Sequence, residues 1–363
     1  MGFKCGIIGL PNVGKSTLFN ALTESNKAEV ANYPFATIEP NVGRVAVPDD
    51  RLNILAKISK SEKIIPTYID FVDIAGLVKG ASSGEGLGNK FLSHIREVDA
   101  IIHVVRCFKD NNITHINNDV SPLKDIETIK TELLLADIEV LERKIQSLQK
   151  KQKSGDKKII YELKILSNLL KKIDENLSNN LYESEIKIID ELNLITTKPT
   201  MYICNVDEKS ILKGNNFSKL VHSKALSENN VSINISASIE AQISELENEE
   251  EKLEFINDLD LKETTLNRLI KSGYNLLNLI TFFTSGPKET RAWTVEKNTE
   301  VSIAAGKIHS DFQKGFIRAE TIKYEDYKKF NGELGVKEAG KLKQEGKGYI
   351  VKDGDIFHFL FNV

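Results

Sequence analysis

A glycine-rich loop close to the N-terminus constrains the fold more than any other segment. Residues 9–16 read Gly-Leu-Pro-Asn-Val-Gly-Lys-Ser and fit the phosphate-binding pattern GxxxxGK[ST]. The apolar residues 3–9 before it are typical of a strand, and residues 14–22 after it have helical spacing. In that context the loop N–H groups and the positive end of the helix dipole converge on a phosphate. The sequence therefore predicts a nucleotide-binding α/β domain.

Four later apolar runs predict further strands of the same sheet. They cover residues 67–74, 100–105, 200–205 and 231–236, and they are mostly unalternating. Such runs suit parallel strands that are buried on both faces. With helical stretches between them, the fold class is α/β, a doubly wound sheet with ligand-binding loops at the carboxyl ends of its strands.

Residues 125–198 interrupt this pattern with two amphipathic helices. Leu134, Ile138, Leu141, Ile145 and Leu148 repeat every three or four residues, and residues 159–177 repeat in the same way. Residues 153–156, Lys-Ser-Gly-Asp, supply a turn between them. The segment is predicted to be an inserted coiled-coil-like hairpin whose apolar seams face each other. Its outer Lys and Glu residues predict a solvated surface or a docking surface.

The predicted division into domains follows from these changes of sequence pattern. Residues 1–124 and 199–275 are expected to form the P-loop domain, 125–198 the hairpin, and 276–363 a β-rich C-terminal domain. Within the last, residues 346–351 are a predicted hairpin partner for residues 355–363. Residues 307–352 hold eleven Lys/Arg against seven Asp/Glu. This mild basic excess predicts either an ordinary surface or a face for ribosomal RNA phosphate.

Composition excludes several classes of protein. The formal net charge is -3, so the whole chain does not indicate nucleic-acid or membrane binding. The three cysteines, Cys5, Cys107 and Cys204, form no CxxC pair and are expected to be buried, reduced thiols. No signal-type region or membrane span is predicted, so a cytoplasmic protein is expected. His103 lies in an apolar run and is expected in the core.

Asp73, Gly76 and Thr37 are expected to complete a magnesium and switch site with Lys15 and Ser16 of the P-loop. Ser16 is expected to coordinate Mg²⁺, and Lys15 to lie between the β- and γ-phosphates. Asp73 and Gly76 form a DxxG pattern at a predicted strand end, in which the Asp holds a Mg²⁺ water and the Gly N–H meets the γ-phosphate. Thr37, in a loop with two prolines, is expected to sense the γ-phosphate and Mg²⁺.

At these residues the chain resembles the YchF or Obg-like ATPase family of the translation-factor P-loop GTPases. The resemblance covers nearly the whole length. It is carried by the P-loop, by Asp-Ile-Ala-Gly-Leu-Val-Lys-Gly-Ala at residues 73–81, by the hairpin and by a C-terminal TGS domain, which includes residues 291–293 and 315–319. It implies a β-grasp-like fold for that last domain.

The base-reading segment departs from the GTPase pattern. GTPases of this fold read guanine with Asn-Lys-x-Asp, whereas this chain has Asn205-Val206-Asp207-Glu208. A longer carboxylate at Glu208 breaks the paired hydrogen bonds to guanine, although a one-residue shift of Asp207 could restore them. The resemblance implies ATP, with Asn205 and Val206 at the adenine and residues 236–238 closing the far side. The expected nucleotide contacts are Asn12, Val13, Gly14, Lys15, Ser16, Thr17, Asn205, Val206, Glu208, Ser236 and Ala237.

Hydrolysis is expected to be slow because the position after DxxG, often Gln, is Leu77. An apolar side chain cannot orient the attacking water. Two replacements are open: Asn12 could bind K⁺, and His115 in the polar segment 110–119 resembles a histidine of the family. The expected catalytic residues are therefore Lys15, Thr37, Gly76 and His115.

The predicted function is a nucleotide-dependent switch, a monomer, that binds ribosomes and hydrolyses ATP in translation or stress response. The ribosome and its RNA are partners that the resemblance implies; no membrane or specific DNA partner is expected. Two other readings stay open. The chain could be a GTPase of the same fold, or a ribosome- or RNA-binding scaffold for which nucleotide is only a structural ligand.

Overall fold

The computed structural model describes residues 3–25, 41–74, 87–110, 112–113, 119–152, 156–174, 181–246 and 248–362. The chain divides into two compact units. Unit 1 comprises Phe3–Gly43 and Asp70–Thr265, and unit 2 comprises Arg44–Ile69 and Leu266–Val363.

The first sheet confirms the predicted doubly wound α/β fold. In spatial order its strands are β2 (Asn41–Ala46), β4 (Tyr68–Asp73), β1 (Lys4–Ile8), β5 (Ala100–Arg106), β6 (Thr200–Asn205) and β7 (Val231–Ile235). β1 pairs in parallel with both β4 and β5, and β5, β6 and β7 continue in parallel. Every residue of β5 is buried, as the unalternating apolar run predicts. The carboxyl ends of β1, β4, β5, β6 and β7 therefore lie at the same edge of the sheet.

Helices of unit 1 connect these strands. They are α1 (Lys15–Ser25), α3 (Leu87–Arg96), α7 (Asn216–Ser227), α8 (Ala237–Glu245) and α9 (Glu249–Asp258), with the short 3₁₀ helix η1 (Glu208–Ser210). α1 packs against α8. This contact brings the helix after the P-loop beside the helix after β7, so two sequence-distant candidate segments become neighbours.

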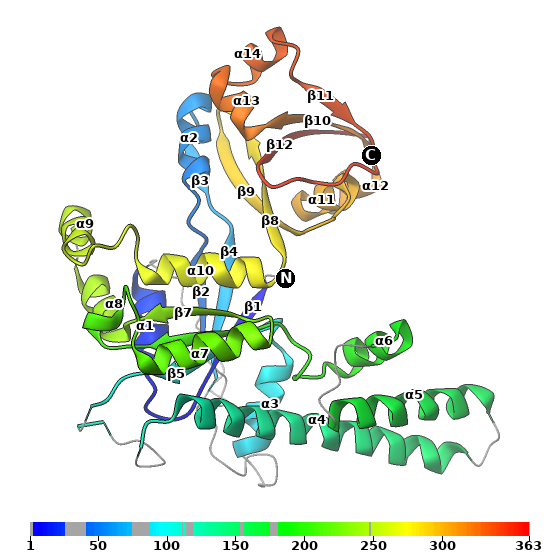
Figure 1. Ribbon diagram of the computed structural model, residues 1–363. Helices are drawn as coiled ribbons and strands as arrows, with labels where there is room; N and C mark the ends of the chain where they lie inside the picture. The colour runs from blue at the N-terminus through cyan, green and yellow to red at the C-terminus, as the bar shows by residue number, and fades with distance from the viewer. Residues whose placement is uncertain are drawn as a thin grey trace. The chain divides into compact units, whose positions relative to one another are not determined.

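The predicted helical hairpin is present in unit 1. It consists of α4 (Pro122–Gln152) and α5 (Lys157–Asp174), followed by α6 (Glu183–Leu192) (Figure 1). Their facing apolar residues form a core of their own, in which Leu141, Leu166 and Leu169 are completely buried. This burial confirms that the apolar stripes are a packing seam. Of the predicted turn, residues 153–155 lie outside the described residues.

Unit 2 is built on the second sheet. In spatial order its strands are β11 (Lys343–Glu345), β10 (Phe316–Lys323), β12 (Asp355–Phe361), β8 (Leu279–Ser285), β9 (Glu289–Glu296) and β3 (Lys63–Ile65). Its helices are α2 (Asp50–Ser59), α10 (Thr265–Leu276), α11 (Val301–Ile308), α12 (Ser310–Lys314), α13 (Tyr324–Lys329) and α14 (Glu333–Glu338). Successive residues of β8 serve opposite faces. Phe282 packs in one apolar cluster and Phe283 in another.

Unit 2 also contains residues 44–69, which the sequence pattern predicts to belong to the P-loop domain. β3 pairs in parallel with β9, and Leu55 of α2 is buried in the same cluster as Phe283. The Arg51 guanidinium donates to Asp353 at 2.7 Å and lies over the Phe283 ring. The compact units thus differ from the predicted boundaries at this segment and at α10, while the functional division into three domains stays a prediction.

One predicted pairing in the C-terminal region is wrong. Residues 346–351 form no strand beside β12; β12 pairs antiparallel with β10 and parallel with β8. Val351 of this segment is buried in the same apolar cluster as Phe357 and Phe359, but its backbone forms only an isolated bridge, between Ile350 and Glu300. Phe357 and Phe359 of β12 are buried with residues of β10 and β8. The apolar content of β12 therefore selects two longer strands as its neighbours.

The predictions for the isolated core residues are confirmed. Cys5, Cys107 and Cys204 are buried, free thiols. His103 is 3% exposed in β5, and burial lowers its pKa to about 3. Among the helices that the structure describes, none has the length and apolar character needed to cross a bilayer.

Candidate functional site

The P-loop between β1 and α1 has a backbone that requires glycine at two positions. Gly14 has φ +97°, and a Cβ there would lie 2.4 Å from the Asn205 side-chain nitrogen. A Cβ at Gly9, with φ +156°, would lie 2.5 Å from the Val104 carbonyl oxygen. Asn12 is also left-handed, at φ +61°. The loop can therefore curl tightly, which is the shape that a backbone phosphate cradle needs.

Lys15 lies inside this loop. Its Nζ donates to the carbonyl oxygens of Gly9 at 2.9 Å and Leu10 at 3.0 Å, and the residue is 7% exposed. Burial lowers the pKa of Lys15 to about 8, and the nearby Asp73 carboxylate acts in the opposite direction. An incoming phosphate could replace these two carbonyls as the partner of the ammonium group, with a gain in charge pairing.

Asp73 ends β4 next to the P-loop. The β1–β4 register pairs it with Ile7, two residues before the loop begins. Burial raises the pKa of the Asp73 carboxyl, and the charge of Lys15 lowers it. Among the described residues, no group of three or more His, Cys, Asp or Glu side chains could hold a metal alone. One carboxylate and the Ser16 hydroxyl instead match Mg²⁺, which prefers oxygen ligands and completes its shell with phosphates and water.

Asn205, the last residue of β6, ties two loops together. Its Nδ2 donates to the Val13 carbonyl at 2.8 Å, and its Oδ1 accepts from the Ala237 N–H at 3.1 Å. The side chain is 6% exposed. Both ends of the amide are therefore engaged in holding the P-loop against the start of α8. We call this pair of bonds the Asn205 clip.

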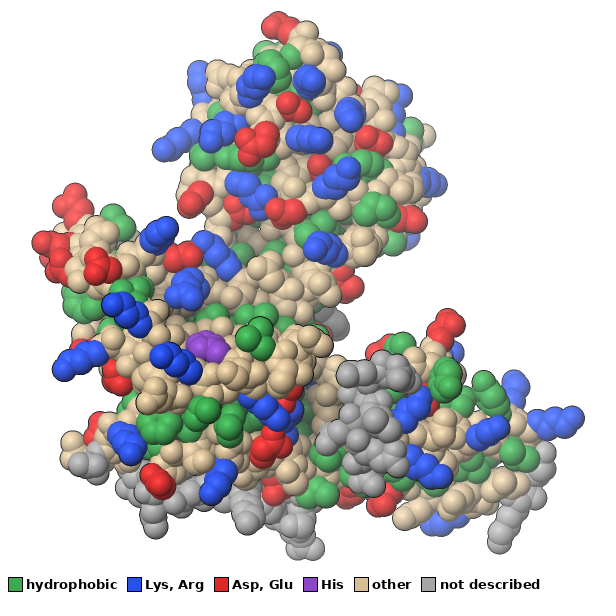
Figure 2. Space-filling view, viewed as in Figure 1, with side chains coloured by type: hydrophobic (Ala, Val, Ile, Leu, Met, Phe, Trp, Pro, Cys, Tyr) green, Lys and Arg blue, Asp and Glu red, His purple; other side chains and the backbone are tan. Residues whose placement is uncertain are grey.

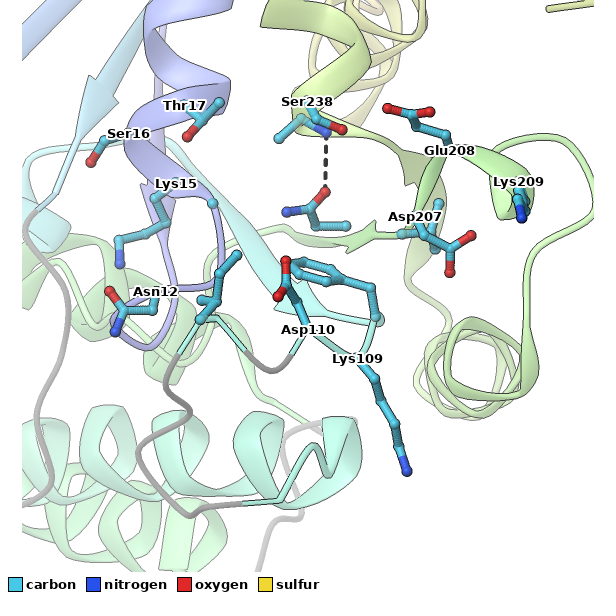
Figure 3. A pocket seen from close by; sticks show the side chains of 16 residues that line it. Asn12, Lys15, Ser16, Thr17, Lys109, Asp110, Asp207, Glu208, Lys209 and Ser238 are labelled. Carbon is cyan, nitrogen blue, oxygen red and sulfur yellow. Dashed lines mark hydrogen bonds between the residues drawn. The ribbon is translucent and has the colours of Figure 1, made fainter.

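A cavity of about 790 Å³ extends from the P-loop to the end of β6. Figure 3 shows Lys15 and Ser16 at one side and Asp207 and Glu208 at the other. The lining residues are Asn12, Gly14, Lys15, Ser16, Thr17, Phe108, Lys109, Asp110, Ile113, Asn205, Val206, Asp207, Glu208, Lys209, Ala237 and Ser238. Its volume is typical of a small-molecule site.

Nine of the eleven expected nucleotide contacts line this cavity. The exceptions are Val13 and Ser236, which are not among the lining residues. Val13 is 1% exposed and offers its carbonyl to the Asn205 clip; Ser236 is fully buried, with its hydroxyl 3.0 Å from that of Ser238. Three expected catalytic residues, Thr37, Gly76 and His115, lie outside the described residues, as does Leu77.

The loop after β5 forms a wall of the cavity, which no sequence motif predicts. Phe108, Lys109, Asp110 and Ile113 all line it. Since this loop follows a central parallel strand, its position at the carboxyl edge was the available signal.

Arg106 holds that loop in place. It is 1% exposed, and its guanidinium donates to the carbonyl oxygens of Phe108 at 3.2 Å, Asp110 at 3.1 Å and Ile113 at 3.0 Å. It also lies 4.7 Å from the centre of the Phe108 ring. The buried Arg106 guanidinium at the end of β5 thus fixes the backbone of this wall of the cavity.

Two protein-family models match the chain. The model described as "50S ribosome-binding GTPase" matches residues 4–164. The model YchF-GTPase_C, described as a protein of unknown function, matches residues 279–362.

Full-length relatives are more similar still. The protein named "Ribosome-binding ATPase YchF" from Haemophilus influenzae is 56% identical over 366 aligned positions, with 100% of each chain covered. The protein of the same name from Bacillus subtilis is 51% identical, again over 100% of both chains.

Solved structures agree on the fold. "Structure of the Schizosaccharomyces pombe YchF GTPase" matches with 38% identity and a TM-score of 0.86, covering 99% of this chain and 98% of that one. A GTP-binding protein from Pyrococcus horikoshii covers 99% and 100% with a TM-score of 0.58, but its 17% identity supports the fold alone.

Proposed function

The chain belongs to the YchF family, and on that premise we propose that it is a ribosome-associated ATPase that acts as a nucleotide-dependent switch. ATP with Mg²⁺ binds in the 790 Å³ cavity and is hydrolysed slowly to ADP and phosphate. The ribosome, including its RNA, is the partner, and control of translation or stress response in the cytoplasm is the setting. The monomer is the working form.

One observation carries the proposal. A single cavity joins the phosphate loop at Lys15 and Ser16 to the base-reading segment at Val206–Glu208. The P-loop supplies donors for the phosphates of any nucleotide, so the other end determines the base. There, Val206 and Glu208 depart from the Asn-Lys-x-Asp pattern of guanine recognition.

The base-reading chemistry favours ATP. A guanine site needs a carboxylate that accepts two hydrogen bonds from one base edge, and a misplaced carboxylate leaves those donors unpaired. The name "Ribosome-binding ATPase YchF" of the bacterial relatives supports this choice.

GTP is the second candidate for two reasons. Asp207 also lines the cavity, so a shorter carboxylate stands beside Glu208. The Schizosaccharomyces pombe relative is named a GTPase.

Lys15, Gly14 and the Asn205 clip bind and orient the triphosphate. Lys15 leaves the Gly9 and Leu10 carbonyls and pairs with phosphate oxygens, which keeps its ammonium charged although burial lowers the pKa to about 8. Because the Asn205 clip fixes Val13 to Ala237, the loop N–H groups keep their positions without nucleotide. A prearranged cradle reduces the ordering cost of binding.

Ser16, Asp73 and Thr37 are the proposed Mg²⁺ residues. The donor set fits, since Asp73 is the last residue of β4, the strand beside β1, and Ser16 follows Lys15 in the P-loop. When bound, Mg²⁺ neutralises charge on the phosphate oxygens. Asp73 also interacts with Lys15, so this carboxylate helps to keep the lysine protonated in the free protein.

Slow turnover follows from Leu77, which cannot orient water. His115 and K⁺ held by Asn12 are the proposed replacements for the missing glutamine. Asn12 lines the cavity with a left-handed backbone, so its side chain stands at the phosphate end.

The decisive experiment is isothermal titration of ATP and GTP into the wild type and the Glu208→Asp variant. We expect tighter ATP than GTP binding in the wild type, and a shift towards GTP when the shorter carboxylate is restored. A lower Kd for GTP in the wild type would overturn the ATP assignment.

The Lys15→Ala variant distinguishes a nucleotide-dependent switch from a ribosome- or RNA-binding scaffold for which nucleotide is only a structural ligand. The variant should lose ATP turnover and any nucleotide dependence of ribosome co-sedimentation. Turnover equal to that of the wild type would contradict the site, and ribosome binding independent of nucleotide in both proteins would favour the scaffold reading.

A further inference from the structure

An exposed face of α5 combines three lysines with one tyrosine near the free end of the hairpin. Lys157, Tyr161 and Lys164 are spaced by four and three residues, and Lys158 precedes Tyr161 by three, so the four side chains share one side of the helix. All are exposed, Tyr161 to 63%. We call these four residues the α5 lysine–tyrosine face. Figure 2 shows basic and apolar side chains together at this end of the hairpin.

The positive charge of this face is not neutralised by acidic partners. Within the described part of the chain, Lys157, Lys158 and Lys164 form no ion pair. The neighbouring Glu162 is already paired with Lys144 at 3.3 Å. Asp156 Oδ1 accepts the Lys158 backbone N–H, so it is used as a helix cap.

Packing and helix stability do not explain these residues. The opposite side of α5, with Leu163, Leu166 and Leu169, fills the hairpin core, so the α5 lysine–tyrosine face contributes nothing to that seam. Lys157 and Lys158 stand in the first turn, where the helix dipole disfavours cations. A large aromatic surface beside unpaired cations, exposed to water, is instead typical of a binding surface.

We propose that the α5 lysine–tyrosine face binds single-stranded or looped RNA, an inference that rests on the proposed ribosome partnership. The lysines contact backbone phosphates, and an unstacked base lies on the Tyr161 ring. Charge complementarity favours a polyanion. RNA is favoured over an anionic membrane because the apolar stripe of α5 is buried, leaving Ile160 and Tyr161 as its large exposed apolar side chains near the described tip.

The test uses the full chain and a fluorescein-labelled oligouridylate of about 12 nucleotides. The Lys157→Gln/Lys158→Gln/Lys164→Gln variant should bind at least tenfold more weakly near 0.1 M salt. Because each lost phosphate contact removes about 0.7 from the slope of log affinity against log salt, the slope should fall by about 2. Tyr161→Ala should weaken binding about fivefold or more, and Tyr161→Phe should retain the wild-type affinity because the ring remains.

A matched control removes the same charge elsewhere in unit 1. Lys213, Lys219 and Lys262 are exposed and lie outside the hairpin. Their triple Gln variant should keep the oligonucleotide affinity and most of the salt slope. Equal losses in both triple variants, or no oligonucleotide binding by the wild type, would overturn the inference. The inference would also be overturned if the Lys157→Gln/Lys158→Gln/Lys164→Gln variant lost binding to phosphatidylserine vesicles but kept the oligonucleotide affinity.

Ribosome co-sedimentation of the same proteins distinguishes the two proposals. If the wild type does not co-sediment with ribosomes, the proposed ribosome partnership fails, while oligonucleotide binding still decides the α5 face. If the wild type co-sediments and the hairpin variant does so equally well, the partnership stands and the α5 inference fails.

Discussion

Replacing Asn205 by alanine removes both bonds of the Asn205 clip at once. The Val13 carbonyl and the Ala237 N–H lose their side-chain partner, in residues that are 1% and 5% exposed. A buried polar group left unpaired costs about 1–3 kcal/mol, so the two together should lower the unfolding free energy of unit 1 by about 2–6 kcal/mol. Nucleotide binding should weaken on the order of tenfold, or about 1.4 kcal/mol, because the P-loop is no longer prearranged.

The same variant tests whether the Asn205 amide positions the loops or reads the base. A positioning role predicts that ATP and GTP lose affinity by the same factor, whereas base reading predicts a change in their ratio. Urea unfolding measures the unfolding free energy, and titration with both nucleotides measures the ratio of ATP to GTP affinity. Asn216→Ala is the matched control, since Asn216 is exposed and should change stability by less than about 0.5 kcal/mol. An equally stable Asn205→Ala protein, or an altered ATP-to-GTP ratio, would refute the positioning role.

Two further predictions concern buried residues of β5. Arg106→Met removes the donors to the loop carbonyls of Phe108, Asp110 and Ile113, so it should weaken ATP binding by a larger factor than pyrophosphate binding; equal losses in calorimetry would contradict the assigned wall. His103 is neutral in the folded protein because burial lowers its pKa to about 3, whereas the unfolded chain takes up a proton below about pH 6.5. Its contribution to stability is therefore complete above pH 6.5 and is lost as the pH falls, by about 2 kcal/mol at pH 5. In urea unfolding, the free energy of unfolding of His103→Leu should depend less steeply on pH below about pH 6.5, by an amount that corresponds to about one proton. An unchanged slope would show that His103 is not the source of this pH dependence.

Local patterns predict the P-loop and five of the six strands of the first sheet, all but β2, because their signals are contained in short segments. Residues 200–205 form the predicted strand without a change of boundary, and the strands at 100–106 and 231–235 differ by one residue. A strand buried on both faces must be apolar throughout, so its sequence reports its environment directly. The hairpin follows for the same reason, since its helical repeat is its packing seam.

Remote pairing explains what the sequence could not predict. β3 has only three residues, Lys63–Ile65, and its partner Arg291 lies more than two hundred residues later. Nothing in a Lys-Ile-Ile segment specifies that partner. Likewise, a buried arginine within an apolar strand gives no local sign that its fork will hold the loop two to seven residues further on. The roles of Arg106 and of residues 44–69 are properties of the assembled fold.

The geometry of unit 1 also explains how purine recognition can differ between proteins of this fold while the phosphate-binding loop stays the same. The Asn205 clip belongs to the loop scaffold, since both ends of its amide hold backbone groups, and Gly14 leaves just enough space for that amide. The residues that vary from the guanine pattern, Val206 and Glu208, follow the clip and are not part of its two bonds. Substitution at these two positions can therefore alter hydrogen bonding to the purine while Lys15 and the P-loop keep their arrangement. Base choice and phosphate binding are then separable. The Glu208→Asp variant should change the preference between ATP and GTP, and the Asn205→Ala variant should weaken the binding of both nucleotides by the same factor.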